Sequence, residues 1–339
     1  MKQVNVGLIG CGEIAESHRE ALERIPGAKL SVVHDRDMIR ARALAARAGA
    51  QVAGSVEEIL RDSSIDAVYI LTRHDSHAAL AVQAAAAGKA IFCEKPMALT
   101  VADAQNVVTQ VEKTGSTMMV GFNYRWTPVV QKAQEWSERQ AGEPYALHLS
   151  FVTSPFLGGW PGLDEEGGGV FHCLGSHAVD LAFCLLGREF SRVQAVQARL
   201  RLEDPYLPDT ASILLQAKDG AMASLLFHDH APESYTRYET GEGSHLIRAG
   251  LFGDGWAVTI DSLSHLTLHD AQGSREVRVA SDSRIERFGI LGENEYFIEC
   301  LLSGFHPHPD EGDGARAVSL VELADRAAES GLAVSQEPL

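Results

Sequence analysis

The sequence contains few cysteines, and they form none of the patterns that bind zinc or build a disulfide framework. The five lie far apart, at positions 11, 93, 173, 184 and 300, and no Cys-x-x-Cys pair occurs. An odd and scattered set is typical of a chain that folds in a reducing compartment. We therefore expect free thiols and a cytoplasmic protein.

Positive charge is also scarce. The chain has 29 lysine and arginine residues against 46 aspartate and glutamate residues, which gives a formal net charge of −17. Such a surface repels a nucleic-acid backbone and an anionic membrane. We therefore expect neither nucleic acid nor a membrane among the partners.

Long apolar runs are missing as well, and Met1 leads directly into a strand-like segment without a cleavable apolar leader. The 339 residues are 45% hydrophobic and 22% charged, which is ordinary globular composition. A chain of this length can build two domains, each with a core of its own. Composition therefore excludes a disordered or disulfide-stapled protein.

The first 122 residues alternate short apolar runs with helical patterns. The apolar runs cover 4–9, 30–34, 65–71, 90–93 and 117–122, and the helices between them include 36–48 and 76–87. Strands that alternate with helices are typical of a doubly wound parallel sheet. We therefore predict an α/β dinucleotide-binding domain over residues 1–122.

The pattern changes in residues 123–339. Strand-like segments follow one another closely, at 146–152, 193–202, 212–217, 221–228, 257–260 and 266–269. Helical stretches are expected at 170–186, 293–302 and 315–329. We predict a second α/β domain in which these helices cover one face of a largely antiparallel open sheet and leave the other face for a partner or a second subunit.

The first apolar run leads into a Gly-x-Gly-x-x-Ala motif formed by Gly10, Gly12 and Ala15. Gly10 permits a tight turn, and Gly12 lets the backbone approach a pyrophosphate. Asp35 ends the second run 20 residues after Ala15, where a carboxylate binds the ribose hydroxyls of a dinucleotide. A glycine-rich turn that only packs a helix on a sheet is the weaker interpretation.

Asp35 also bears on the choice between NAD and NADP. A carboxylate facing the adenosine ribose repels a 2′-phosphate, which favours NAD. Arg36 and Arg40 lie close enough in sequence to receive that phosphate if Asp35 turned away. We therefore expect NAD, with NADP as the alternative.

The fourth apolar run ends in Glu94-Lys95-Pro96. In open α/β sheets ligands bind beyond the carboxyl ends of the strands, where this charged pair is expected. Strand alternation directs Glu94 and Lys95 to opposite sides, and an apolar setting would destabilise the ammonium of Lys95 and let it exchange protons near neutral pH. Taken alone, however, a lysine at a strand end is more often a surface residue.

A run of three glycines precedes the helix expected over 170–186. On a continuous α-helix, offsets of four, three and four place four side chains on one stripe: Cys173, His177, Asp180 and Cys184. His177 then either faces a ligand cleft or packs as a satisfied histidine against the sheet.

Taken together, these segments resemble the Gfo/Idh/MocA oxidoreductases, a family named after glucose-fructose oxidoreductase and inositol dehydrogenase. The resemblance covers nearly the whole chain. It rests on five segments: GCGEIA at 10–15, LTRHDSH at 71–77, EKP at 94–96, GFNYR at 121–125 and GGGVFHCLGSH at 167–177. Their combination is far more specific than any one of them.

The resemblance implies a Rossmann domain followed by an α/β domain whose open sheet carries substrate contacts and often the oligomer interface. It implies that Lys95 neighbours the nicotinamide and takes part in proton transfer, and it favours the cleft position for His177. We expect the cofactor to contact Gly10, Gly12, Glu13, Ile14, Asp35, Arg36, Thr72, Arg73, His74, His77 and Glu94. The expected substrate contacts are Asn123, Trp160 and Cys173.

Cys173 is a departure from the family, because many relatives carry aspartate four residues before the histidine. A thiol is smaller than a carboxylate and uncharged at its ordinary pKa, so a role in holding a sugar hydroxyl would be lost. Cys173 is then a pocket residue for a different substrate, a nucleophile, or a small buried helix residue. Trp160 in a glycine-rich loop either stacks on a sugar ring or anchors the loop.

Several histidines suggest a metal site, and we discount it. His228 and His230 share a strand face without a third ligand at suitable spacing, and His306, His308 and Asp310 lie in a polar, proline-interrupted stretch typical of an exposed loop. We expect no metal.

The sequence thus predicts an NAD-dependent dehydrogenase that transfers a hydride between nicotinamide and a secondary alcohol of a sugar, a sugar derivative or a cyclic polyol. In this prediction Lys95 and His177 are catalytic and the chain forms a homo-oligomer through its second sheet. One alternative is an enzyme that cleaves glycosides by transient oxidation with NAD. Another is an NAD-bound sensor that has lost turnover.

Overall fold

The computed structural model describes residues 3–236 and 245–335, and the chain falls into two compact units. The first unit takes in the chain up to Asn123 and then Gly289–Val318. The second unit consists of Tyr124–Phe288 and the chain from Ser319 onward. The chain therefore passes from the first unit to the second, returns to the first for residues 289–318, and ends in the second.

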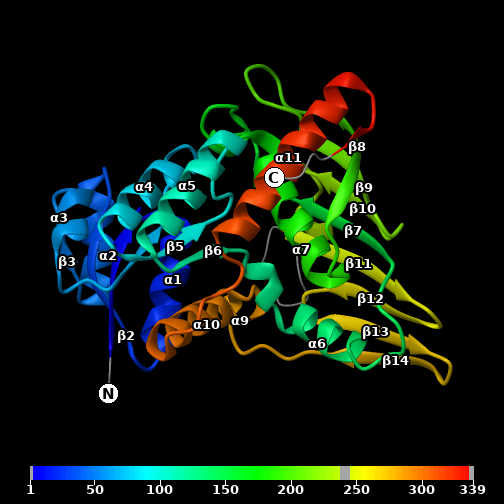
Figure 1. The fold of residues 1–339 in the computed structure, drawn as a ribbon, viewed down its shortest axis with the longest axis horizontal. Coiled ribbons are helices and arrows are strands. Elements are labelled where there is room, and N and C mark those ends of the chain that lie inside the picture. Colours follow the sequence, from blue (N-terminus) through cyan, green and yellow to red (C-terminus); the bar gives the residue numbers. More distant parts are fainter. Residues whose placement is uncertain (1–2, 237–244, 336–339) are drawn as a thin grey trace. The chain divides into compact units, whose positions relative to one another are not determined.

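The first unit is built on a parallel sheet with the strand order β3-β2-β1-β4-β5-β6 (Figure 1). Its strands are β1 Val4–Ile9, β2 Ala28–His34, β3 Gln51–Val52, β4 Ala67–Ile70, β5 Ala90–Glu94 and β6 Met118–Gly121. Its helices are α1 Glu13–Arg24, α2 Met38–Ala48, α3 Val56–Arg61, α4 His74–Ala86, α5 Val101–Thr114 and α10 Ile290–Ser303, and α11 Glu311–Ser330 begins in this unit. This strand order is that of the Rossmann fold, and it confirms the predicted doubly wound α/β class.

Local chemistry sets the limits of these helices. The side chains of Asp37, Ser55 and Thr100 accept hydrogen bonds from the first amides of α2, α3 and α5. Two of the same helices end at Gly49 and Gly115, both of which adopt the left-handed conformation that glycine tolerates best.

Helix α10 packs in the first unit, which corrects the prediction that residues 293–302 cover the second sheet. It lies beside α1 (Figure 1). The ring of Phe297 meets the stacked rings of Tyr69 and Phe92 edge-on, with centroids 5.8 and 5.7 Å away. All three rings are fully buried, so aromatic packing holds α10 on this sheet.

The second unit is built on a mixed sheet with the strand order β14-β13-β12-β11-β7-β10-β9-β8-β15. Every neighbouring pair is antiparallel except β7 and β10. The strands are β7 Ala146–Thr153, β8 Phe190–Ala198, β9 Thr210–Ala217, β10 Met222–His228, β11 His245–Gly253, β12 Trp256–Ser262, β13 His265–Asp270, β14 Gly273–Arg278 and β15 Val334–Ser335. The largely antiparallel sheet predicted for this part of the chain is confirmed.

The helices of the second unit are α6 Pro128–Ser137, α7 Ser176–Leu186, α8 Glu233–Thr236 and α9 Arg284–Arg287, with short 3₁₀ turns η1 Asn123–Trp126 and η2 Trp160–Gly162. A π-helical turn, η3 Phe171–Gly175, precedes α7. The single α-helix predicted over 170–186 is therefore wrong at its start. Helix α7 packs on β7 and β10.

Strand β8 ends at Ala198, four residues before the predicted end. The fully buried carboxylate of Asp209 accepts hydrogen bonds from the backbone N–H groups of Leu200, Arg201 and Leu202, at 3.0, 2.7 and 3.0 Å. These donors turn the chain away from the sheet. Burial raises the pKa of Asp209, but the hydrogen bonds outweigh it and hold that pKa below its ordinary value.

We expect Asp209→Asn to lower the free energy of unfolding at neutral pH by about 2 kcal/mol, because a neutral amide oxygen is a weaker acceptor than a carboxylate for these three N–H groups. Since the folded-state pKa is depressed, this stabilisation is present above the unfolded pKa of about 4 and is lost as the pH falls through the folded value. Urea titrations at neutral and acid pH measure the difference, with the exposed turn variant Asp254→Asn as control. An equal loss of unfolding free energy at both pH values would contradict the view that the charge of Asp209 stabilises the fold.

Candidate cofactor and catalytic site

The predicted cofactor residues of the first unit lie along one edge of its sheet. Gly10 follows β1, Asp35 follows β2, Thr72 comes shortly after β4, and Lys95 follows β5. Because these strands are parallel, their carboxyl ends meet at the same edge, which is where open α/β sheets bind ligands. The structure therefore brings these four positions together.

The turn after β1 has the geometry of a pyrophosphate site. Gly10 has φ +97°, and a Cβ at this position would lie 2.6 Å from the carbonyl oxygen of Leu71. Gly12 precedes α1 without a side-chain cap, and the space that its Cβ would occupy is open. Glu13 is exposed and Ile14 half-buried at the helix start. The first amides of α1 can therefore face a bound phosphate.

Asp35 lies against this turn. Its carboxylate accepts hydrogen bonds from the backbone N–H of Cys11 at 2.6 Å and of Asp37 at 2.7 Å. Arg36 is exposed, and the guanidinium of Arg40 lies 3.5 Å from Asp37. The negative charge therefore sits beside the glycine turn. Burial, reinforced by Asp35, raises the pKa of Cys11 to about 12, so that thiol stays protonated.

The loop after β4 is tied to the Glu94-Lys95-Pro96 turn by His77. The fully buried ring of His77 lies 2.8 Å from the carbonyl oxygen of Pro96 and 3.0 Å from that of Thr72. Burial lowers the pKa of His77. At the start of α4, Arg73 is exposed and His74 is buried. The side chain of His77 thus braces two loops, and its predicted contact with the cofactor stays a prediction.

Glu94 is buried and Lys95 is half-buried. One carboxylate oxygen of Glu94 accepts the backbone N–H of Lys95 at 3.1 Å, and the other lies 3.1 Å from the ring of His18. Sequence reasoning missed His18. Its signal was the spacing Ala15, His18, Ala21, which places it on the buried face of α1.

His177 in the second unit is held between aromatic rings. Its imidazole stacks parallel to Phe151 with centroids 5.8 Å apart and meets Tyr124 edge-on at 4.7 Å. The residue is 7% exposed. The π-helical turn lies directly before α7, and such turns occur frequently at functional sites.

Asp180 and Cys184, which were predicted to lie on one helix face with His177, make contacts with other residues. Asp180 is buried and forms a bidentate ion pair with Arg125, with N–O distances of 2.6 to 2.9 Å. Cys184 accepts a hydrogen bond from the side chain of Gln134 at 3.1 Å. The ion pair fixes η1, and with it Tyr124, against α7. Sequence reasoning missed Tyr124 and Arg125 as supports of His177, although both lie in the GFNYR segment.

The three predicted substrate residues have different surroundings. Cys173 is buried in the π-helical turn, Trp160 is half-buried at the start of η2, and Asn123 is half-buried at the end of the first unit. Their contacts with substrate stay predictions.

The absence of a metal stays a prediction, because the ligand atoms of His308, Asp310 and Asp313 lie within 4.8 Å of one another. His228 lies 3.0 Å from the hydroxyl of Thr210, and His230 lies 2.9 Å from Asp229. His308 is exposed and lies 3.3 Å from a carboxylate oxygen of both Asp310 and Asp313.

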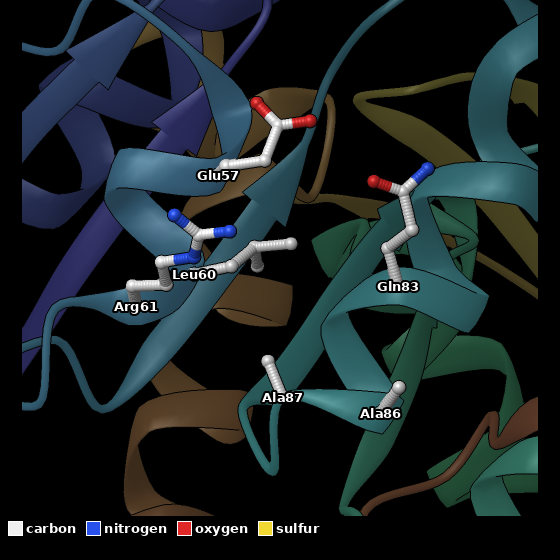
Figure 2. A pocket seen from close by; sticks show the side chains of 6 residues that line it. All are labelled: Glu57, Leu60, Arg61, Gln83, Ala86 and Ala87. Carbon is white, nitrogen blue, oxygen red and sulfur yellow. The ribbon is translucent and has the colours of Figure 1, made fainter.

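One shallow pocket of the first unit lies away from the carboxyl edge. It sits beside the ends of α3 and α4, which lead into the amino ends of β4 and β5 (Figure 2). Its lining residues are Glu57, Leu60, Arg61, Gln83, Ala86 and Ala87. It is therefore separate from the glycine turn and from Lys95.

The chain matches two family models. Residues 4–122 match the Gfo/Idh/MocA model described as an oxidoreductase family with an NAD-binding Rossmann fold, and residues 130–254 match the C-terminal domain of the same family. Among the helices of the described residues, none has both the length and the apolar character needed to cross a membrane.

Named relatives are similar over almost their entire length. An inositol 2-dehydrogenase of Rhizobium meliloti is 30% identical over 95% of this chain and 96% of its own. A D-apiose dehydrogenase of Paraburkholderia graminis is 27% identical over 100% of this chain and 91% of its own.

Solved structures share the fold. An oxidoreductase from Agrobacterium radiobacter in complex with NAD⁺, L-tartaric acid and magnesium aligns with a TM-score of 0.86 and 26% identity, over 98% of both chains. A levoglucosan dehydrogenase in complex with NADH and levoglucosan aligns with a TM-score of 0.87 and 23% identity, over 98% of this chain and 99% of its own. The two matched domains and the inositol 2-dehydrogenase at 30% identity show that the chain belongs to the Gfo/Idh/MocA family and is an NAD-dependent oxidoreductase.

Proposed function

We propose that this protein oxidises a secondary alcohol of a sugar, a sugar derivative or a cyclic polyol, or catalyses the reverse reduction. The observation that carries this proposal is Lys95 at the carboxyl end of β5, on a turn that is fixed from two sides. Glu94 binds the amide of Lys95, and His77 lies against the carbonyl of Pro96. The relatives named as inositol and apiose dehydrogenases support this substrate class.

NAD supplies the hydride acceptor when bound, and side chains of the protein transfer the proton. Lys95 accepts the hydroxyl proton as the hydride leaves. His177 hydrogen-bonds the same oxygen or passes the proton onward, and the rings of Tyr124 and Phe151 restrict the orientation of its imidazole.

A substrate panel with purified protein and NAD tests the proposal. The panel contains myo-inositol, D-apiose, other cyclic polyols and para-nitrophenyl glycosides, with NADH absorbance and nitrophenol release followed in parallel. We expect net NADH with at least one polyol or sugar. Glycoside cleavage without net NADH would favour transient oxidation, and NAD binding without turnover would favour a sensor. Either result would contradict the proposal.

We expect Lys95→Ala to lower kcat by roughly 100- to 10,000-fold, the range typical of a positioned proton-transfer group. NAD affinity should largely survive, because the glycine turn and Asp35 are untouched. Steady-state kinetics and an NAD titration measure the two effects, and Lys113→Ala on the exposed face of α5 is the matched control. Normal turnover of Lys95→Ala would disprove its role.

The position of Asp35 predicts a preference for NAD over NADP, because its carboxylate repels a 2′-phosphate. We expect Asp35→Ser to narrow this preference by roughly tenfold or more. Fluorescence titrations of both proteins with NAD and NADP measure the ratio of dissociation constants. A wild-type preference for NADP would contradict the prediction and direct attention to Arg36 and Arg40.

We also propose that the protein is a homo-oligomer that pairs through the uncovered face of its second sheet. Buried side chains alternate with more exposed ones along β9 and β10, and α7 packs on one face of the sheet. The other face exposes large apolar side chains from four strands: Val196, Leu214, Met222, Leu226 and Phe252. A second copy of the same face would bury them.

We expect wild-type protein to sediment as a dimer or larger assembly and Leu214→Arg to dissociate it, because a charge would be buried in the interface. Ile39→Arg is the control, since Ile39 is 79% exposed on α2 of the first unit. A monomeric wild-type protein at micromolar concentration would contradict the proposal.

A cytoplasmic location belongs to the same proposal. All five cysteines are free thiols, and four of them are buried. Such a set needs no oxidising compartment.

A further inference from the structure

A buried polar cluster lies inside the first unit, directly behind the Glu94-Lys95-Pro96 turn. His18 comes from α1, Glu94 from β5, and Glu293 and Asn294 from α10. His18, Glu293 and Asn294 are fully buried and Glu94 is 8% exposed. The rings of Tyr69, Phe92 and Phe297 line the same region. Polar groups in such an apolar setting are costly unless they are paired.

Hydrogen bonds connect the members of this cluster. The side-chain nitrogen of Asn294 donates to the carbonyl oxygen of Ile290 at 2.7 Å, and this contact fixes which atom of the amide is nitrogen. Nδ1 of His18 lies 3.0 Å from the same nitrogen and 3.3 Å from the amide oxygen, so Asn294 can donate to Nδ1 or accept from it. A carboxylate only accepts, so Nε2 of His18 donates to Glu94 at 3.1 Å. Glu94 also accepts the amide of Lys95 at 3.1 Å.

The two carboxyl groups of the cluster differ in charge. Burial raises the pKa of Glu94, but the hydrogen bond from His18 and the nearby His18, Lys95 and His77 outweigh it, so that pKa lies below its ordinary value. Burial and the charge of Glu94 raise the pKa of Glu293 well above its ordinary value.

Neither oxygen of Glu293 has a hydrogen-bond partner within the described residues. Glu293 interacts electrostatically with Tyr69 and with Glu94. Glu94 is therefore the charged member and Glu293 the neutral one.

We infer that Asn294 and His18 are positioning residues that act in series to hold Glu94 as a buried carboxylate, and that Glu94 in turn holds the backbone of Lys95. Asn294 orients the ring of His18, His18 donates to Glu94, and Glu94 accepts the amide of Lys95. The network thereby fixes both the direction of the turn and a negative charge next to it. The part that concerns Lys95 rests on the proposed function.

His18, Glu94 and Glu293 lie close enough to suggest a metal site, since their ligand atoms are all within 4.8 Å of one another. Both ring nitrogens of His18, however, already have partners in Asn294 and Glu94. The cluster is therefore a series of hydrogen bonds in which each side chain orients the next, and Glu293 lies beside it as a neutral group.

NAD⁺ affinity tests the inference without any substrate. The proposed function places the nicotinamide beside Lys95, and a carboxylate nearby favours the positively charged oxidised ring over NADH. In His18→Phe the donor is lost while most of the ring volume remains. Burial then dominates, so the pKa of Glu94 rises and its charge forms only at higher pH.

We expect His18→Phe to bind NAD⁺ roughly three- to tenfold more weakly than wild type near pH 6, with NADH affinity little changed, and to approach wild type near pH 9. His18→Gln retains a donor and should restore wild-type behaviour. Asn294→Leu removes the group that orients the ring of His18, and it should shift the pH dependence of NAD⁺ affinity in the same direction but by a smaller amount. It also keeps the test decisive if His18→Phe does not fold.

Glu94→Gln removes the charge at every pH and serves as the reference. Its NAD⁺ affinity should be weaker than that of wild type by a factor that does not change with pH. Glu293→Gln copies the neutral acid and should leave NAD⁺ affinity and thermal stability near wild type. His18→Phe could instead lose the same affinity for NAD⁺ at all pH values, or lose as much affinity for NADH as for NAD⁺. Either result would show that the network only contributes packing and would overturn the inference. A stoichiometric metal ion found in the purified protein by mass spectrometry would also overturn it.

The inference and the proposed function can fail separately. Absence of turnover in the substrate panel leaves the NAD⁺ titrations unaffected. If a substrate is found, the variants should lower kcat more than they raise KM, because the reacting lysine moves while substrate contacts remain.

Discussion

A charged carboxylate can remain inside a protein only where several hydrogen-bond donors converge on it, and Glu94 meets this requirement. One donor is the ring of His18 on α1, and the other is the backbone of the next residue, Lys95. The turn that presents Lys95 therefore depends on a helix that begins far away in the sequence, at the glycine turn. The first amides of the same α1 can face a pyrophosphate, so in our proposal one helix links cofactor binding to the position of the lysine.

In the second unit, too, neighbouring side chains fix the orientation of a predicted catalytic residue, but through different interactions. Flat aromatic surfaces orient His177, and the Arg125–Asp180 ion pair holds one of these surfaces in place. The resemblance to the family leads us to expect a carboxylate four residues before His177, and this chain has the buried thiol of Cys173 there. A thiol in this position cannot bind a sugar hydroxyl as strongly as a carboxylate, which is a reason to expect a substrate preference of its own.

Local patterns predicted what depends on neighbours in sequence. The alternation of strands and helices, the Gly10–Gly12 turn and Asp35 follow from spacing alone, and the structure places them as a parallel sheet requires. The patterns failed where long-range packing decides. Residues 293–302 form the predicted helix, but their place beside α1 depends on contacts such as His18 with Asn294, which are 276 residues apart. The π-helical turn before His177 shows the same limit, because helical spacing does not distinguish it from an α-helix.

The central claim is a direct hydride transfer between an alcohol carbon and nicotinamide, with the proton handled by Lys95. The most direct measurement uses the best polyol of the panel with deuterium on its reacting carbon. We predict that the label appears in the reduced cofactor, which mass spectrometry detects as NADD, and that turnover slows by a primary isotope effect when chemistry limits the rate. Unlabelled NADH, or a label that remains in the carbohydrate while the cofactor returns to its oxidised form, would contradict the claim.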